Sequence, residues 1–153
     1  MNIRFTGDEH FTFEQMPVGA LLSDFWSWTT ERMLTDDVLP ILAHYIVETA
    51  LGDKIDRRRI TIVVSSYLKS FSRQDKIEAP VFHCPDADDT LRIFCLLDGL
   101  NANTVNPLKL EQWKFFVLKS GDLTGETATL DEIRHIATEA SYEELRNTVT
   151  ARL

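Results

Sequence analysis

The stretch Ile60–Phe71, ITIVVSSYLKSF, decides the fold predicted for this chain. Its first half is a run of β-branched residues, which favours a strand that is buried on both faces. Its second half places hydroxyls, a tyrosine and a lysine at the end of that strand, where many α/β folds hold their functional groups. We therefore expect a core strand over Ile60–Tyr67 whose polar end could carry a site.

Two helices are predicted before this strand. From Ala20 onwards apolar residues recur at helical spacing, and Phe25, Trp26 and Trp28 cover more than one face, so we expect this helix to pack on two sides. The second helix starts after the N-cap candidates Thr35-Asp36-Asp37. It runs through Leu39 and Leu51 to a stop at Gly52. Residues 1–16 predict a short strand or hairpin with Gly7-Asp8 as its turn.

Further strands and two helices are predicted after the core strand. The strands are expected at Ile77–Cys84, where Pro80 favours an edge, at Leu91–Leu97 and at Trp113–Leu118. Helices are expected over Thr129–Glu139 and from Ser141 onwards, and each begins with a Ser/Thr-x-x-Glu capping box. The order predicts an α/β protein, an α+β sandwich with a central mixed sheet of four to five strands flanked by helices.

Composition indicates an ordinary globular protein, with 44% hydrophobic and 26% charged residues among 153. The length predicts a single domain over residues 1–153. No apolar run reaches the length of a membrane span, and the start MNIRFTGDEHFTF does not resemble a secretory signal, so we expect a cytoplasmic protein. Cys84 and Cys95 lie in apolar segments without metal-ligand spacing and are expected to be buried thiols.

The charge balance bears on possible partners. The formal net charge is −8, from 16 basic and 24 acidic residues. Proteins that bind duplex DNA normally show a basic footprint, whereas the basic cluster of Lys54 and Arg57–Arg59 is interrupted by Asp53 and Asp56. Direct nucleic-acid binding is therefore not favoured, and the acidic surface suits either solubility or a partner with a basic groove.

Motifs for cofactor or nucleophile chemistry are absent from the sequence. There is no glycine-rich phosphate loop and no GxSxG elbow. His44 and Glu48 share one helix face and could begin a metal site, but a third ligand is not evident, and a hydrogen-bonded pair is the favoured interpretation. We predict neither a metal nor a cofactor.

A metal-dependent nuclease would need carboxylates that converge on Mg²⁺ at the end of a strand, with a lysine near the attacking water. Alternate residues of a strand point the same way, so an acid-x-lysine pattern places both groups on one face. The core strand carries Thr61 and Val63 at such positions. Neither residue supplies that chemistry.

Several segments nevertheless resemble a bacterial and phage family of PD-(D/E)XK, restriction-endonuclease-like proteins, and the resemblance spans roughly Phe25 to Val149. The segments are FWSW at Phe25–Trp28, LAHYIVETALG at Leu42–Gly52, SSYLKSF at Ser65–Phe71, LRIFCLLD at Leu91–Asp98, NPLKLEQWKFFVL at Asn106–Leu118, TLDEIRHI at Thr129–Ile136 and SYEELRNTV at Ser141–Val149. The resemblance implies a restriction-endonuclease-like fold.

The catalytic positions of that family pattern have been replaced. The helix glutamate corresponds to His44, and Glu-x-Lys corresponds to Thr61 and Val63. The sheet aspartate has only Asp53 or Asp56 as a loose substitute in a connector that is too short. Loss of all these positions together indicates a retained fold without the activity, so no catalytic residue is predicted.

The first hypothesis is therefore a catalytically inactive nuclease-like protein that acts by protein binding. One version is a phage or mobile-element inhibitor of a host nucleic-acid-targeting defence system, whose partner is a host nuclease or defence complex. Its carboxylates would imitate DNA phosphates, and the candidates are Asp86, Asp88 and Asp89. Another version is a homodimer, or pairing with an active nuclease subunit, through the Trp26 and Trp28 face or the edge strand with Pro80.

Two alternatives stay open. One is a working metal-dependent nuclease with a relocated site, built from His44, Glu48, Asp56 and Lys69. The other is a nucleic-acid-binding module that does not cleave, with contacts from Arg57, Arg58, Arg59, Lys69 and Arg73.

Overall fold

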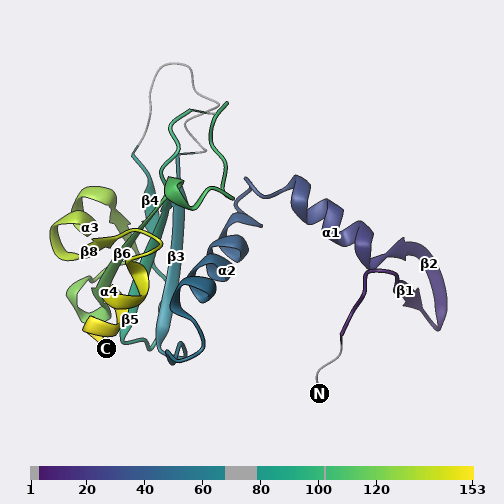
Figure 1. Cartoon of the computed structure of the whole chain (residues 1–153), viewed down its shortest axis with the longest axis horizontal. Coiled ribbons are helices and arrows are strands. Elements are labelled where there is room, and N and C mark those ends of the chain that lie inside the picture. The colour runs from purple at the N-terminus through teal and green to yellow at the C-terminus, as the bar shows by residue number, and fades with distance from the viewer. Residues whose placement is uncertain (1–3, 68–78, 102) are drawn as a thin grey trace.

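The computed structural model describes residues 4–67, 79–101 and 103–153. Within these ranges the chain forms a body around a mixed four-stranded sheet and an arm that extends away from it (Figure 1). The sheet order is β3 (Ile60–Ser66), β5 (Leu91–Leu97), β6 (Trp113–Lys119) and β8 (Thr138–Ala140). β3 runs parallel to β5, whereas the β5–β6 and β6–β8 pairs are antiparallel. The predicted mixed α/β architecture with a central sheet is confirmed.

The two middle strands form the centre of the body. All seven residues of β5 are buried, and so is most of β6. The register sets Ile93 opposite Val117 and Phe94 opposite Phe116. Because successive side chains point to opposite faces, these strands bury apolar groups on both sides of the sheet. Each face therefore needs its own cover.

Helices α2 (Leu39–Leu51) and α4 (Leu145–Arg152) cover one face, and they pack on Ile93, Cys95 and Phe115. α2 ends at Gly52 as predicted, and the φ of 73° at Gly52 suits a residue without a Cβ. The N-cap of α2 is Val38, and not one of the predicted caps Thr35, Asp36 and Asp37. The capping box before α4 forms in both directions. The Ser141 amide donates to Glu144 Oε1 at 3.0 Å, and the Glu144 amide donates to Ser141 Oγ at 3.3 Å.

The opposite face is covered by α3 (Leu130–Ile136) and a small antiparallel sheet of β4 (Val81–His83) and β7 (Thr127–Thr129). Phe82 of β4 meets Phe94 of β5 edge to face, with ring centroids 5.2 Å apart. Thr129 caps α3 by accepting the Glu132 amide at 3.3 Å. Two short 3₁₀ turns, η2 (Leu110–Gln112) and η3 (Ser120–Asp122), flank β6.

Three predictions about the body need correction. β3 was expected to be buried on both faces, but it lies at an edge of the described sheet and only Val63 among its residues is buried. The strand expected over Ile77–Cys84 is reduced to β4, which pairs with β7 outside the main sheet; residues 77 and 78 lie outside the described ranges. The helix expected to reach Glu139 ends at Ile136, because the next residues pair with β6 as strand β8.

The arm contains a hairpin of β1 (His10–Phe13) and β2 (Met16–Leu21) followed by helix α1 (Leu22–Glu31). The hairpin turns at Glu14-Gln15, both with positive φ, as two-residue hairpin loops prefer, and not at Gly7-Asp8. Pairing of β2 with β1 delays the helix beyond Ala20. The prediction that this helix packs on two sides is wrong, because none of its residues is buried in the described structure. No helix of the described ranges is long and apolar enough to cross a bilayer.

Burial of apolar side chains on both faces of the sheet predicts that truncating one of them lowers the free energy of unfolding. Phe94→Ala removes a fully buried ring between β4 and β6, and we expect the free energy of unfolding to fall by about 3–5 kcal/mol. Urea denaturation followed by far-UV circular dichroism measures this loss. Leu108→Ala is the matched control, since that side chain is exposed, and a loss of equal size there would contradict the assignment of the core.

Candidate functional site

The face of β3 that would carry nuclease chemistry instead belongs to the core. Val63 packs in the cluster with Phe82 and Phe94, which line the side covered by α3 and β4. Ser65 points the same way and donates its hydroxyl to the Val81 carbonyl oxygen at 3.0 Å. This face therefore holds methyl and hydroxyl groups where an acid and a lysine would be needed.

A buried ion pair lies at the start of β5, near Thr61. Arg92 Nε donates to Asp89 Oδ2 at 3.0 Å, and the two side chains are only 10% and 3% exposed. Arg92 also donates to the Pro85 carbonyl oxygen at 3.4 Å. Burial disfavours the charged carboxylate, but the Thr61 and Ser120 hydroxyls and the Arg92 guanidinium outweigh it, so the pKa of Asp89 lies below its usual value.

Two polar atoms of this network have incomplete partners. Asp89 Oδ1 and Ser120 Oγ are buried, and neither atom forms a hydrogen bond of standard geometry with another described residue. Cys84 lies close by, and burial raises the pKa of its thiol although Arg92 opposes the shift. Burial also raises the pKa of Cys95. Both cysteines are free, Cys95 fully and Cys84 half buried, and both stay protonated thiols that are unsuited to nucleophilic catalysis.

A second polar group lies at the carboxyl ends of β3 and β5, a position that sequence reasoning missed. Lys114 Nζ bonds Asp98 Oδ2 at 2.8 Å, and this bond raises the pKa of Lys114. The pKa of the nearby Tyr67 is raised by burial first and by the Asp98 carboxylate second. A lysine held in its charged form and a protonated phenol do not act as general bases near neutral pH.

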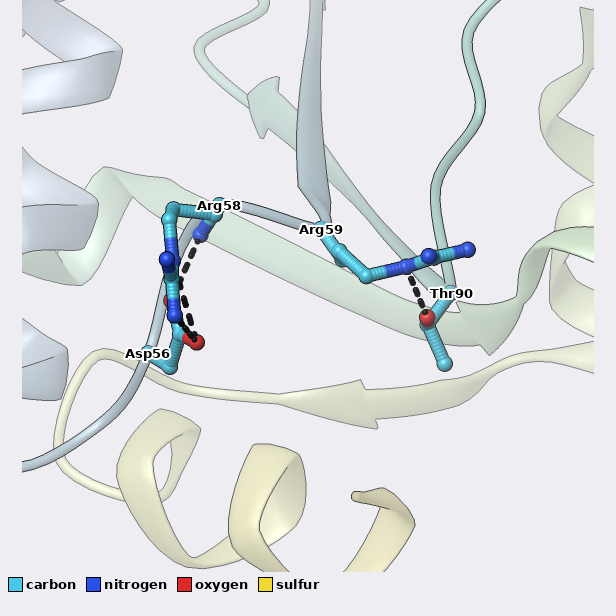
Figure 2. A network of polar contacts seen from close by, with 4 residues as sticks. All are labelled: Asp56, Arg58, Arg59 and Thr90. Carbon is cyan, nitrogen blue, oxygen red and sulfur yellow. Dashed lines mark hydrogen bonds and ion pairs between the residues drawn. The ribbon is translucent and has the colours of Figure 1, made fainter.

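Two arginines of the basic cluster before β3, Arg58 and Arg59, bond neighbouring side chains (Figure 2). Arg58 Nη2 bonds Asp56 Oδ2 at 2.9 Å, and the Arg58 side chain lowers the pKa of Asp56 to about 2. Arg59 bonds Thr90 Oγ1 at 3.0 Å and Asp88 Oδ1 at 3.2 Å. These pairings reduce the charge available for phosphate contacts. The other predicted cations, Lys69 and Arg73, lie outside the described residues.

The three predicted acidic residues, Asp86, Asp88 and Asp89, differ in how far they are exposed. Asp86 is exposed, and Asp88 is exposed although it contacts Arg59. Asp89 must be removed from the set of surface carboxylates, because it is buried against Arg92. Asp89 is buried because Arg92, three residues further along the chain, is itself buried and requires a nearby anion.

The His44 and Glu48 side chains are exposed on α2, and no hydrogen bond joins them in the described part of the chain, so the predicted pair is not formed. Across the same ranges, no group of three His, Cys, Asp or Glu side chains could hold a metal ion. The relocated nuclease site is therefore not assembled from His44, Glu48 and Asp56. Its fourth member, Lys69, is not described.

A pocket of about 470 Å³ lies between the first turn of α2, the end of β3 and strand β4. Its polar lining comes from Asp36, Ser65, Ser66 and His83. Ser65 is already bonded to the backbone of β4. The pocket holds no convergent pair of carboxylates and no cation from the described residues, so its lining does not define a reaction.

Within the described residues, the arm exposes several large aromatic side chains. Phe25, Trp26 and Trp28 are 49%, 46% and 45% exposed, and Phe11 and Phe13 of the hairpin are exposed as well. Phe25 and Trp28 share one side of α1, whereas Trp26 lies on another side and packs against Gly7. We call these five side chains, which lie on more than one side of the arm, the aromatic surface. Phe25 and Trp28 stack at 6.1 Å between centroids, and the Arg32 guanidinium lies 4.2 Å from the centre of the Trp28 ring.

The arm is ordered by its own hydrogen bonds. The Leu22 amide donates to Glu9 O at 2.9 Å and the Ser23 amide to Gly7 O at 3.0 Å, which fixes the helix on the hairpin. The Glu9 carboxylate accepts the Thr6 and Gly7 amides, and these bonds, led by that of Thr6, hold its pKa at about 2. The aromatic surface is therefore presented on a preformed unit.

Neither a family model, a curated protein nor a solved structure matches this chain.

The buried ion pair predicts a pH-dependent stability. Asp89→Asn removes the charge that neutralises Arg92, and we expect a loss of about 3 kcal/mol near neutral pH, as for broken buried pairs. The pKa of Asp89 is lowered by folding, so its contribution is complete above the unfolded pKa of about 4 and is lost as the pH falls below it.

Urea denaturation of the natural chain and of Asp89→Asn between about pH 3 and pH 8 tests this prediction. The difference between the two proteins should be constant above about pH 5 and shrink in acid. The control is Asp88→Asn, an exposed pair that should change stability by no more than about 0.5 kcal/mol. A difference that grows in acid would refute the assigned role of Asp89.

Proposed function

We propose that this chain is a nuclease-like protein without catalytic residues, which acts by binding another protein through the aromatic surface of its arm. The observation that carries the proposal is the exposure of this surface on an ordered unit of the chain. Tryptophan is enriched at the energetic centres of protein interfaces, so exposed aromatic side chains on an ordered unit support a role in binding.

The interior of the body supports the non-catalytic part of the proposal. Thr61 and Val63 stand where the resemblance to restriction endonucleases places an acid and a lysine. Thr61 lies beside a carboxylate that is already paired with Arg92, and Val63 lies in a buried cluster that contains three phenylalanines. His44 replaces the helix glutamate and is exposed without a partner ligand among the described residues. The restriction-endonuclease-like assignment of the fold is part of this proposal.

The acidic charge suggests the kind of partner. A net charge of −8 favours partners with basic surfaces. A concrete version is an inhibitor, from a phage or mobile element, of a cytoplasmic nucleic-acid-targeting complex, with Asp86 as a freely exposed carboxylate of the loop before β5. Direct nucleic-acid binding is less well supported, because Arg58 and Arg59 are paired with Asp56 and Asp88.

The first test concerns catalysis. Incubation of the purified chain with supercoiled plasmid and Mg²⁺ or Mn²⁺ should leave the plasmid intact, as judged by agarose gel against a known nuclease. Asp56→Ala is the matched variant for a relocated site. Cleavage by the natural chain that Asp56→Ala abolishes would overturn the non-catalytic proposal.

The second test concerns binding. Immobilised chain should capture a protein from a host-cell lysate, and Trp26→Ser/Trp28→Ser should reduce the captured amount at least about tenfold, because interface tryptophans commonly contribute about 2 kcal/mol or more. Quantitative mass spectrometry measures the difference. Leu108→Ser is the control for an exposed apolar residue outside the arm. Equal capture by the arm variant and the natural chain would exclude the aromatic surface.

A further inference from the structure

The body carries a groove with an apolar floor, between helix α3 and the loop that follows η3. Its volume is about 540 Å³. The floor is formed by Leu123, which is partly buried, and by Ile136, which is 38% exposed. Leu123 also packs on the core cluster that contains Phe82 and Phe94, so the floor is fixed to the body. α3 lies at the end of the molecule opposite the arm (Figure 1), and the groove is therefore separate from the aromatic surface.

Three carboxylates surround this floor. Asp131 and Glu132 come from the first turn of α3, and Asp122 comes from η3. All three are exposed, and in the described part of the chain none of them forms an ion pair. Asp131 and Glu132 also suit the N-terminus of their helix, which favours negative charge, whereas Asp122 lies on a different element. The groove therefore combines an apolar floor with negative charge that the chain leaves unpaired.

The neighbouring basic groups do not offset this charge. Arg134 is not part of the lining, and it lies near Tyr67 and Lys114 at the carboxyl ends of β3 and β5. The His135 ring lines the groove, but its Nδ1 lies 2.7 Å from the Asp131 carbonyl oxygen and is thereby bonded to its own helix. A ligand for this groove must bring its own positive charge.

The spacing of the carboxylates indicates the kind of cation. Among the described residues no group of three His, Cys, Asp or Glu side chains could hold a metal ion, so the carboxylates of the groove do not converge on one point. A suitable cation must reach separate carboxylates and also cover apolar surface. An arginine side chain meets both needs, because its aliphatic stem packs on apolar groups and its planar guanidinium carries five N–H donors and is weakly hydrated.

We propose that this groove binds an arginine side chain from a basic segment of a partner protein. The aliphatic stem lies on Leu123 and Ile136, and the guanidinium lies among the three carboxylates. The proposal rests on the proposed function for its partner, since a net charge of −8 favours a protein with a basic surface. It adds a contact made by the body to the contact made by the arm.

Titration of the full-length, ¹⁵N-labelled chain with the peptide acetyl-Ala-Arg-Leu-Arg-Ala-amide tests the groove directly. In about 0.15 M NaCl, which screens long-range attraction, the amide signals of residues 122–124 and 131–136 should shift and saturate with a dissociation constant below about 1 mM. The peptide with glutamine in place of both arginines is the control for apolar contact alone, and it should produce no saturable shift.

Two matched variants separate the groove from overall charge. Asp131→Asn/Glu132→Gln should weaken binding of the arginine peptide at least about threefold, because two exposed charge contacts are lost. Its helix keeps its cap, since Thr129 accepts the backbone amide of residue 132. Asp53→Asn/Glu111→Gln removes the same charge from two other exposed positions and should leave binding unchanged. Far-UV circular dichroism confirms that both variants are folded.

Three results would overturn the inference: no saturable shift with the arginine peptide, shifts spread over acidic residues outside the groove, or equal weakening by the two double variants. The outcome is separable from the proposed function. If the peptide fails to bind while Trp26→Ser/Trp28→Ser still abolishes capture of a protein, only the groove is excluded. If the peptide binds the groove while that arm variant captures as much as the natural chain, the role of the arm is excluded and the groove is retained.

Discussion

The antiparallel pairing of β5 with β6 sets the conditions that the rest of the body meets. Both strands are apolar on both faces, so neither face of the pair can be left in water. α2 and α4 cover one side, whereas α3 and the β4–β7 sheet cover the other. The charged residue within β5, Arg92, is also buried, and this requires the buried carboxylate of Asp89 in the preceding loop. The position of that loop therefore depends on the same strand pair.

The arm, unlike the body, is ordered by local hydrogen bonds and not by burial of its helix. Its hairpin and helix satisfy their backbone groups through local hydrogen bonds, but they bury no helix side chain within the described structure. Trp26 packs against Gly7, where a Cβ would approach the ring to 2.7 Å, so even this contact involves backbone and not a core. Local order without burial explains how a large aromatic surface can be both well placed and exposed. Exposure of so many aromatic side chains to water carries a free-energy cost of solvation.

Much of the body could be predicted from the sequence, because strong local signals agree with the tertiary structure. LRIFCLL and WKFFVLK are predominantly apolar runs, and α2 has a clear stop at Gly52. Thr129 caps α3 as predicted, whereas α4 begins at Leu145 and not directly after Ser141. The failures involve information that is not local. The β-branched run of β3 cannot reveal that its strand lies at an edge, and Thr138–Ala140 becomes a strand only by pairing with β6. Helical periodicity in α1 marks an apolar stripe but does not say what covers it.

For the candidate site, the sequence placed Thr61 and Val63 on one strand but could not describe their surroundings. Both residues lie on β3, and their contacts show what an acid and a lysine would meet at these positions. A carboxylate at position 61 would lie beside the buried carboxylate of Asp89, and two close carboxylates do not both ionise readily. A lysine at position 63 would need to place its ammonium among Phe82, Phe94 and Phe116, where desolvation disfavours the charge. An acid at position 61 and a lysine at position 63 would therefore compete with the Asp89–Arg92 pair and with the phenylalanine cluster that stabilise this body.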